Sequence, residues 1–256
     1  MDLSQDKPIL WITLINFGYI RFTKNFLASI KHNKVNLHLI VYCLDNESMK
    51  ALENEPLVTC LDARVFVKGQ MNKSLTTWNT SDYKRIVFAK LDAIRYTMEK
   101  YVNSTVAYID TDIFIFKDPT PMIMKAFQDN PSAIIISQCD EAHLKCSNPM
   151  KCPNLCSGVI AFRQSPITNS LVQYTEKDIT LHLTDQHFLT AILQKTNTPY
   201  YTIDKNIFLN GAYPRVKELN CKPILPQEAV LLHYNYMIGM EKEKNMKKNG
   251  MWLIGA

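Results

Sequence analysis

Two aspartates that lie one residue apart are the residues with the clearest chemical potential. Asp110 and Asp112 occur in VAYIDTDIFIFKDP, residues 106–119, whose other residues are mostly apolar and prone to form strands. Residues i and i+2 of an extended segment point to the same side, so both carboxylates can hold one hard divalent cation and leave sites for phosphate oxygens. The alternative is a turn in which they accept backbone hydrogen bonds. Because unpaired charge in a core is costly, some partner must be present.

Apolar segments around this pair predict the elements that position it. Strands and helices are expected to alternate in the first part of the chain, at 9–17, 19–33, 37–45, 46–54 and 63–69. Asn46 is the expected cap of the second helix. This β-α-β-α-β order with apolar strands predicts an α/β fold, with a mostly parallel central sheet flanked by helices.

The remaining segments extend the same pattern. A long amphipathic helix is predicted over 81–102, with Ile86, Lys90 and Ala93 near one another on it. Further strands are expected at 105–110, 133–137, 157–162 and 229–236, and helices at 165–177 and 183–195.

Polar residues follow the carboxyl ends of several predicted strands. They are Asn16, Gly18 and Tyr19 after the first strand, Asp45 after the second, and Asp110 with Asp112 after the fourth. In open α/β sheets, ligands bind beyond the carboxyl ends of the strands. The sequence therefore predicts that these residues converge on one polar rim.

Composition agrees with a globular protein of this class. The chain has 256 residues, of which 46% are hydrophobic and 21% charged, and only seven glycines, so one domain over 1–256 is expected without a flexible linker. Part of the net charge of +5 lies near the C-terminus, in 240–252, where a solvated helix face is the favoured interpretation of the lysines. No aromatic-basic platform for nucleic acid is present. The sequence does not predict the oligomeric state.

The sequence also carries expectations about compartment and thiols. No basic segment followed by an apolar one opens the chain, and no run of about 18 apolar residues occurs, so we expect a soluble, cytoplasmic protein without a membrane span. Four cysteines cluster with His143; they are Cys139, Cys146, Cys152 and Cys156. Their spacing contains no C-x2-C pair, so reduced thiols are favoured over zinc or a disulfide.

The segment 106–119 resembles the D-x-D segment of GT-A fold nucleotide-diphospho-sugar transferases, especially the group that contains the plant cell-wall xylosyltransferases. Further matches follow in the expected order, at CSGVIAFR (156–163), LTDQHFL (183–189), LNGAYPR (209–215) and LLHYNYMIGMEKEKNMKKNGMW (231–252). The loop 138–155 has no counterpart. The resemblance implies a single GT-A domain, with a nucleotide-binding half over about 1–118 and an acceptor-side half over about 119–256.

The resemblance also implies a metal site. Asp110, Asp112 and His233 would hold Mn²⁺ or Mg²⁺, and an imidazole beside carboxylates suits Mn²⁺ better. Without the resemblance, a core histidine at the end of a strand is an equally good interpretation of His233.

The implied donor site draws on both ends of the chain. Its residues are Asn16, Gly18, Tyr19, Asp45, Arg85, Lys90, Asp110, Thr111, Asn235, Gly239 and Lys242. The tyrosine ring would stack on the base, while Gly239 and Lys242 would close over the pyrophosphate, with Lys244, Lys247 and Lys248 as alternatives to Lys242. Lys90 or Arg85 would reach the diphosphate, although either is equally interpretable as a helix cation that extends to solvent.

Two further sets complete the expected site. Asp185 and Gln186 would lie beneath the sugar as catalytic residues, and an N-cap role for Asp185 or Thr184 is compatible with this. Cys156, Ser157 and Gly158 would lie on the acceptor side.

The function implied is transfer of a hexosyl or pentosyl group from a nucleotide diphosphate sugar, a UDP-sugar by preference, to a hydroxyl of a glycan or protein-linked glycan. Retention of configuration is favoured over inversion. The alternatives are a sugar-nucleotide or glycan-binding module on the same fold and a metal-dependent nucleotidyltransferase. A phosphohydrolase fits less well, because Phe114 occupies the position where D-x-D-x-[TV] needs Thr or Val.

Overall fold

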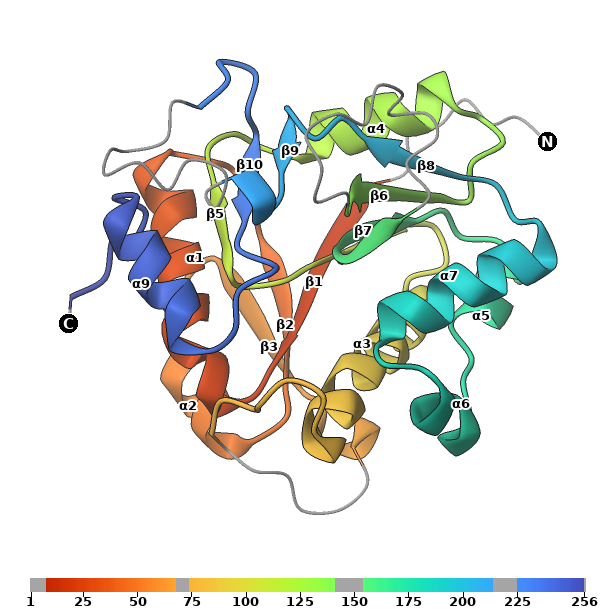
Figure 1. Ribbon diagram of the computed structural model, residues 1–256, viewed down its shortest axis with the longest axis horizontal. Coiled ribbons are helices and arrows are strands. Elements are labelled where there is room, and N and C mark those ends of the chain that lie inside the picture. The colour runs from red at the N-terminus through yellow and green to blue at the C-terminus, as the bar shows by residue number, and fades with distance from the viewer. Residues whose placement is uncertain (1–7, 68–73, 141–153, 214–224, 256) are drawn as a thin grey trace.

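A seven-stranded sheet forms the centre of the molecule. The computed structural model describes residues 8–67, 74–140, 154–213 and 225–255. The sheet has the order β3-β2-β1-β4-β7-β6-β8 (Figure 1). Its strands are β1 (Ile9–Ile15), β2 (Leu39–Cys43), β3 (Val58–Asp62), β4 (Thr105–Ile109), β6 (Ile135–Cys139), β7 (Leu155–Phe162) and β8 (Tyr200–Ile203). Only β7 runs antiparallel to its neighbours, so the prediction of a mostly parallel α/β sheet is confirmed.

A second, three-stranded sheet brings distant parts of the chain together. It has the order β5-β10-β9, with β5 at Ile113–Ile115, β9 at Phe208–Leu209 and β10 at Leu231–His233. Strand β10 is antiparallel to β5, and its register sets His233 opposite Ile113. His233, near the end of the chain, is therefore the cross-strand neighbour of Ile113, the residue that follows Asp112.

Helices cover both faces of the large sheet. Helices α1 (Ile20–His32), α2 (Asn46–Leu52) and α4 (Thr120–Asp129) lie on one side, and α3 (Ser81–Lys100), α5 (Pro166–Leu171), α6 (Glu176–Leu181) and α7 (Asp185–Thr196) on the other, as Figure 1 shows. Helix α9 (Met240–Lys248) packs over the small sheet. Short 3-10 helices occur at Phe17–Tyr19 and Arg64–Phe66.

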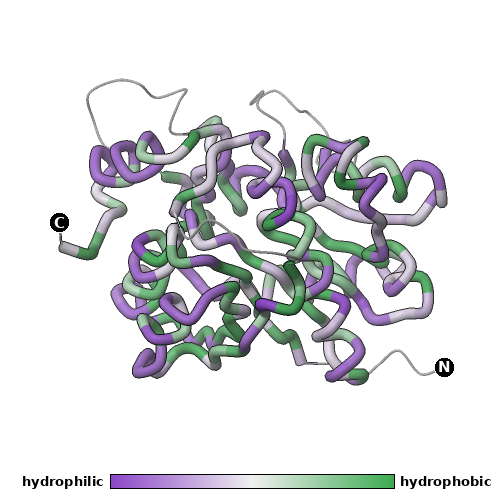
Figure 2. Tube along the Cα trace, turned by 90° about the horizontal axis from the view of Figure 1, so that it is seen from below, coloured by the Kyte–Doolittle hydropathy of each residue, from purple (hydrophilic) through white to green (hydrophobic). Residues whose placement is uncertain are grey.

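The hydrophobic pattern explains this layering. In α1, Phe22, Phe26 and Ile30 recur at helical spacing and are buried, and the large-sheet strands are buried at most positions except on the edge strand β3. Figure 2 shows hydrophobic stretches through the interior and hydrophilic residues along the outer helices. The apolar strands and the amphipathic helices thus specify the same core.

The structure corrects two local predictions. The strand expected at 63–69 is wrong, because Arg64–Phe66 forms a 3-10 helix and the strand is Val58–Asp62 instead. Asn46 is not the cap of α2, because Asp45 precedes that helix and its carboxylate accepts a hydrogen bond from the Ser48 backbone N–H. Carboxylates at this position satisfy orphan amides of the first turn.

The C-terminal segment is tied to the first helix. The fully buried Asn25 of α1 donates from Nδ2 to the Met251 carbonyl at 2.9 Å and accepts at Oδ1 from the Leu253 N–H at 2.6 Å. Arg21 also forms an ion pair of 3.0 Å with the buried Glu243 of α9. Both ends of α9 are therefore held against α1.

Two further expectations concern the membrane and the thiols. None of the helices in the described residues is long and apolar enough to cross a membrane.

The expectation of reduced thiols is wrong for Cys139, which forms a disulfide, and holds for Cys156, whose thiol is free. Cys146 and Cys152, like His143, lie outside the described residues.

Candidate active site

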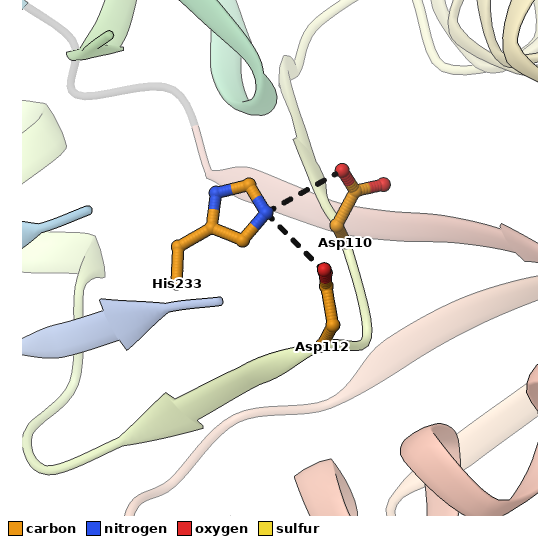
Figure 3. Close-up of side chains that lie close together, drawn as sticks. All are labelled: Asp110, Asp112 and His233. Carbon is orange, nitrogen blue, oxygen red and sulfur yellow. Dashed lines mark ion pairs between the residues drawn. The ribbon is translucent and has the colours of Figure 1, made fainter. Parts of the chain in front are cut away.

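Three side chains from two segments converge beside the small sheet. Asp110 and Asp112 lie in the three-residue link between β4 and β5, and His233 ends β10. His233 Nε2 lies 3.3 Å from Asp112 Oδ1 and 3.8 Å from Asp110 Oδ2, and the imidazole ring points toward both carboxylates (Figure 3). One potential ligand atom from each residue lies within 4.8 Å of the other two.

Backbone hydrogen bonds hold the two carboxylates in this arrangement. The Asp110 N–H donates to the Gly158 carbonyl of β7 at 2.7 Å, and the Asp112 carbonyl accepts from the Tyr234 N–H at 2.9 Å. The Tyr108 hydroxyl donates to Asp110 Oδ1 at 3.1 Å. The position of the acidic pair is therefore set by strands on either side of it.

Cations surround the buried Asp112. The Lys242 ammonium forms an ion pair with Asp112 Oδ2, and His233 lies against Oδ1. Burial raises the pKa of Asp112, but Lys242 and His233 outweigh this and hold it well below its usual range. In turn, burial lowers the pKa of His233 while Asp112 and Cys156 raise it, to a net value of about 10. His233 is therefore protonated at neutral pH when no metal is bound.

Lys90 is a second buried cation beside the acidic pair. Its Nζ lies 3.3 Å from Asp185 Oδ2 and 3.7 Å from Asp110 Oδ1, and it donates to the carbonyl and hydroxyl oxygens of Ser157 at 3.3 Å each. It also lies over the Tyr108 ring at 4.6 Å. Burial lowers the pKa of Lys90, but the two carboxylates raise it well above its usual value. Lys90 is thus a charged link between α3, α7 and the β4–β5 connection.

The three converging side chains fit a divalent cation. Two carboxylates and an imidazole are a donor set suited to Mn²⁺, and one potential ligand atom of each side chain lies within 4.8 Å of the other two. Because metal ligands must be deprotonated, binding would take the proton from His233 Nε2 and displace Lys242 from Asp112. The candidate metal site is therefore Asp110, Asp112 and His233.

A cavity of about 690 Å³ opens at this cluster. It lies beyond the carboxyl ends of β1 and β4, as the sequence leads one to expect. Fourteen of the expected site residues line it, namely Tyr19, Lys90, Asp110, Thr111, Asp112, Cys156, Ser157, Gly158, Asp185, Gln186, His233, Asn235, Gly239 and Lys242. Among the described residues, its lining does not include Asn16, Gly18, Asp45 or Arg85.

Three of those four residues shape the turn that presents Tyr19. Asp45 Oδ2 accepts from the Phe17 N–H at 2.7 Å, and the Asn16 carbonyl accepts from the Tyr19 N–H at 3.0 Å. A Cβ at Gly18 would lie 2.3 Å from the backbone of Ser74, so only glycine fits there. The fourth residue, Arg85, is exposed on α3.

The start of α7 places two side chains at the cavity wall. Thr184 is the N-cap, and the buried Asp185 is the first residue of the helix. Gln186 Oε1 accepts from the Ser157 N–H at 3.2 Å, while its Nε2 donates to Asp140 Oδ2 at 2.7 Å. Asp185 therefore faces Lys90, and Gln186 is fixed between β7 and the end of β6.

Several cavity residues were not expected from the sequence. The Trp78 and Tyr83 rings lie with centroids 4.9 Å apart and planes tilted by 51°, and Asp140 bridges Gln186 and Asn235. Trp78 is 46% exposed, and in the sequence it stands in the polar segment TTWNTSD (76–82) before a predicted helix, which was a usable signal. Asp140 follows a predicted strand as Asp45 does, but it lies in the loop that the resemblance left unmatched.

Gly158 provides a test of the metal site. A Cβ at this position would lie 2.3 Å from His233 Cε1 and 2.5 Å from Asp110 Oδ2. We expect Gly158→Ala to push these ligands apart and to weaken Mn²⁺ binding about 10-fold or more, as losses of ligand positioning do. Isothermal titration with Mn²⁺ measures this, and circular dichroism checks the fold. Gly255→Ala is the control, since a Cβ there meets nothing within 4 Å. Equal Mn²⁺ affinity in both variants contradicts the metal site.

Comparisons with solved structures agree with this architecture. Galactosyltransferase LgtC, in complex with donor and acceptor sugar analogs, superposes with a TM-score of 0.54 at 10% identity, covering 96% of this chain and 97% of that one. Mouse xyloside xylosyltransferase 1 gives 0.54 at 14% identity, with 90% and 97% covered. A glycosyltransferase involved in glycosylation of the major capsid of PBCV-1 gives 0.51 at 11% identity, with 96% and 100% covered. At these identities the likeness shows the fold, which is that of GT-A glycosyltransferases.

Other comparisons concern length and sequence family. The bifunctional glycosyltransferase WbbM matches at 12% identity and a TM-score of 0.54 over 97% of this chain, which spans only 50% of that protein. No curated protein sequence matches the chain. The family model for nucleotide-diphospho-sugar transferases matches residues 34–246, which is most of the chain. The protein therefore belongs to the nucleotide-diphospho-sugar transferase family of glycosyltransferases.

Proposed function

We propose that the protein transfers a hexosyl or pentosyl group from a UDP-sugar to a hydroxyl of a glycan or of a protein-linked glycan, with Mn²⁺ or Mg²⁺ bound at Asp110, Asp112 and His233. The bond between the anomeric carbon and the diphosphate oxygen breaks, and a bond from that carbon to the acceptor oxygen forms. The acceptor proton leaves with the departing phosphate, and the configuration is retained.

One observation supports this proposal most strongly. Three potential cation ligands and the Lys242 ammonium meet at one wall of a cavity of about 690 Å³, at the carboxyl edge of the sheet. A cation bound there supplies positive charge to a departing diphosphate. Lys242 adds a second positive charge at the same wall, which favours an anionic ligand over a neutral sugar.

The donor would lie along the wall from Tyr19 to Lys242. The Tyr19 ring is the expected base-stacking surface, and Thr111, Asn235 and Gly239 line the cavity beside the cation ligands. Gly239 has φ of 55°, which few other residues adopt, so its backbone can approach phosphate closely. In this proposal, Asn16, Gly18 and Asp45 contribute to nucleotide binding by holding the turn before Tyr19. Arg85 is the more distant cation of α3.

The sugar would lie above Asp185 and Gln186. Lys90 holds Asp185 beside Asp110, so the carboxylates face the donor sugar while their charge is offset. Cys156, Ser157 and Gly158 also line the cavity, with Ser157 in contact with Lys90 and Gln186, and we assign this segment to the acceptor side. In this arrangement the metal ligands come from both the 1–118 half and the 119–256 half of one domain.

Ligand-dependent thermal stability tests the proposed donor. UDP with Mn²⁺ at about 100 times the dissociation constant should stabilise the fold by about 2.7 kcal/mol, which raises Tm by about 5–10 °C for a chain of this size. EDTA should remove most of that rise. A panel of nucleoside diphosphates and nucleotide sugars identifies the base and the sugar by the largest shift. Absence of any metal-dependent shift across the panel contradicts the proposal.

Product analysis separates this proposal from its alternatives. Release of UDP from a UDP-sugar in the presence of Mn²⁺, with or without an acceptor, is expected for the transferase. A binding module would show the thermal shift without turnover. A nucleotidyltransferase would release pyrophosphate from a nucleoside triphosphate instead.

A further inference from the structure

Gln138 is a fully buried amide at the junction of the two sheets. It lies in β6, where the register against β7 shifts between Ser137 and Gln138. Such irregularities re-aim side chains, often next to active sites. Here the Gln138 side chain leaves the large sheet and reaches β9 and β10 of the small one.

Two carbonyls fix which end of the amide faces the histidine. Gln138 Nε2 donates to the Leu209 carbonyl at 2.8 Å and to the Phe208 carbonyl at 3.2 Å. A flipped amide would set its oxygen against both carbonyl oxygens and leave buried acceptors without donors, which is costly. Gln138 Oε1 therefore faces His233 Nδ1, at 2.9 Å.

This contact keeps a proton on Nδ1 of the His233 ring, whether or not Nε2 is also protonated. Oε1 is an acceptor only, so Nδ1 must donate to it as N–H. The competing neighbour is Cys156 Sγ at 3.6 Å. The sulfur of a cysteine is only a weak acceptor. The amide oxygen is both closer and stronger.

We propose that Gln138 is a positioning residue that keeps the proton of His233 on Nδ1 and presents the lone pair of Nε2 to the cation held with Asp110 and Asp112. The inference rests on the metal role in the proposed function. Metal-bound histidines commonly donate their other N–H to a fixed acceptor, which sets the tautomer and the ring orientation. In this protein a glutamine amide from a different sheet fills that place.

Nitrogen NMR of the His233 imidazole tests the tautomer directly. In the wild-type protein loaded with Zn²⁺, a diamagnetic stand-in, we expect Nδ1 to be protonated and Nε2 to be metal-bound. This measurement needs no variant and so does not depend on the stability of a mutant. Metal coordination through Nδ1, or a proton on Nε2, overturns the proposal.

A matched pair of variants tests the effect on affinity. Gln138→Met keeps the length of the side chain but removes the acceptor, and we expect its Mn²⁺ Kd to rise about 10- to 100-fold. Ser137→Ala is the control, since it removes a buried hydroxyl that bonds to backbone atoms of Cys156 and Gln138 and not to His233. A purely structural role for Gln138 predicts lower Tm in both variants with the wild-type Kd retained, and that result overturns the proposal.

The same titration separates this inference from the proposed function. If wild-type protein does not bind Mn²⁺, the metal role in the proposed function is wrong. If wild-type protein binds Mn²⁺ and Gln138→Met binds it equally well, only the positioning role of Gln138 is wrong.

Discussion

Replacing Asp112 by asparagine is expected to lower metal-dependent sugar transfer by at least about two to three orders of magnitude, the usual cost of removing one preorganised electrostatic contact. Asp112 is the more deeply buried carboxylate of the pair, and both His233 and Lys242 contact it. The rise in Tm that Mn²⁺ gives with UDP should disappear in the same variant. Steady-state transfer assays and thermal shifts measure the two effects.

A surface aspartate supplies the matched control for this experiment. Asp62 at the end of β3 pairs with the exposed Arg64, so Asp62→Asn makes the same chemical change away from the cavity. Transfer and the Mn²⁺-dependent shift should both stay near wild type in the control. Retention of both in Asp112→Asn means that this carboxylate is not a metal ligand.

The same substitution has a predicted effect on pH dependence. Burial lowers the pKa of His233, but Asp112 and Cys156 raise it to about 10, well above the ordinary value of 6.5, so this pairing stabilises the metal-free fold at neutral pH, and the contribution is lost as pH rises from about 6.5 through about 10. With asparagine at 112, the pKa of His233 should fall and the loss should be complete at a lower pH. NMR titration of the His233 ring measures this, and an unchanged pKa contradicts the pairing.

Replacing Lys90 by methionine is expected to lower the free energy of unfolding by about 3–5 kcal/mol, because one partner of a buried ion pair is removed and the other stays. The carboxylate left behind is Asp185, which is 2% exposed and has its only ion pair among the described residues with Lys90. Urea unfolding followed by circular dichroism measures the change.

A double variant shows whether the loss comes from stranded charge. Lys90→Met combined with Asp185→Asn leaves no buried unpaired carboxylate at that position, so it should be more stable than Lys90→Met alone. Lys100→Met on the exposed end of α3 is the control and should change stability by less than about 1 kcal/mol. A double variant that is less stable than the single one contradicts this account of Lys90.

The apolar pattern predicted most of the large sheet because its central strands are buried on both faces. Strands β1, β2 and β4 are continuous apolar runs, and α3 has clear helical spacing. The third strand was misplaced because β3 is an edge strand whose Thr59 and Asp62 are exposed, which conceals its apolar positions. The apolar residues after it belong to a 3-10 helix instead.

The acidic pair was predicted from its spacing, but His233 joined the candidate metal site only through the family resemblance, and the structure brings the three side chains together. Spacing cannot link Asp112 to His233, because the small sheet that joins them pairs strands more than 100 residues apart. The contact between Gln138 and His233 could not be predicted either. A glutamine in an apolar strand indicates that its amide has a buried hydrogen-bond partner, but the sequence does not show the register shift in β6 or the position of β9, which select that partner. The disulfide of Cys139 was not predicted, because the spacing of cysteines along the chain does not give the distances between their sulfur atoms.

The anchoring of α9 to α1 has a consequence for the choice of ligand. Tyr19 precedes α1, and Lys242 lies on α9, which Arg21 and Asn25 tie to the same helix. The position of the aromatic ring relative to the ammonium group is therefore fixed by the scaffold. In the proposed donor complex Lys242 contacts the diphosphate, so we expect nucleoside monophosphates, which lack the second phosphate, to be poor competitors of the donor.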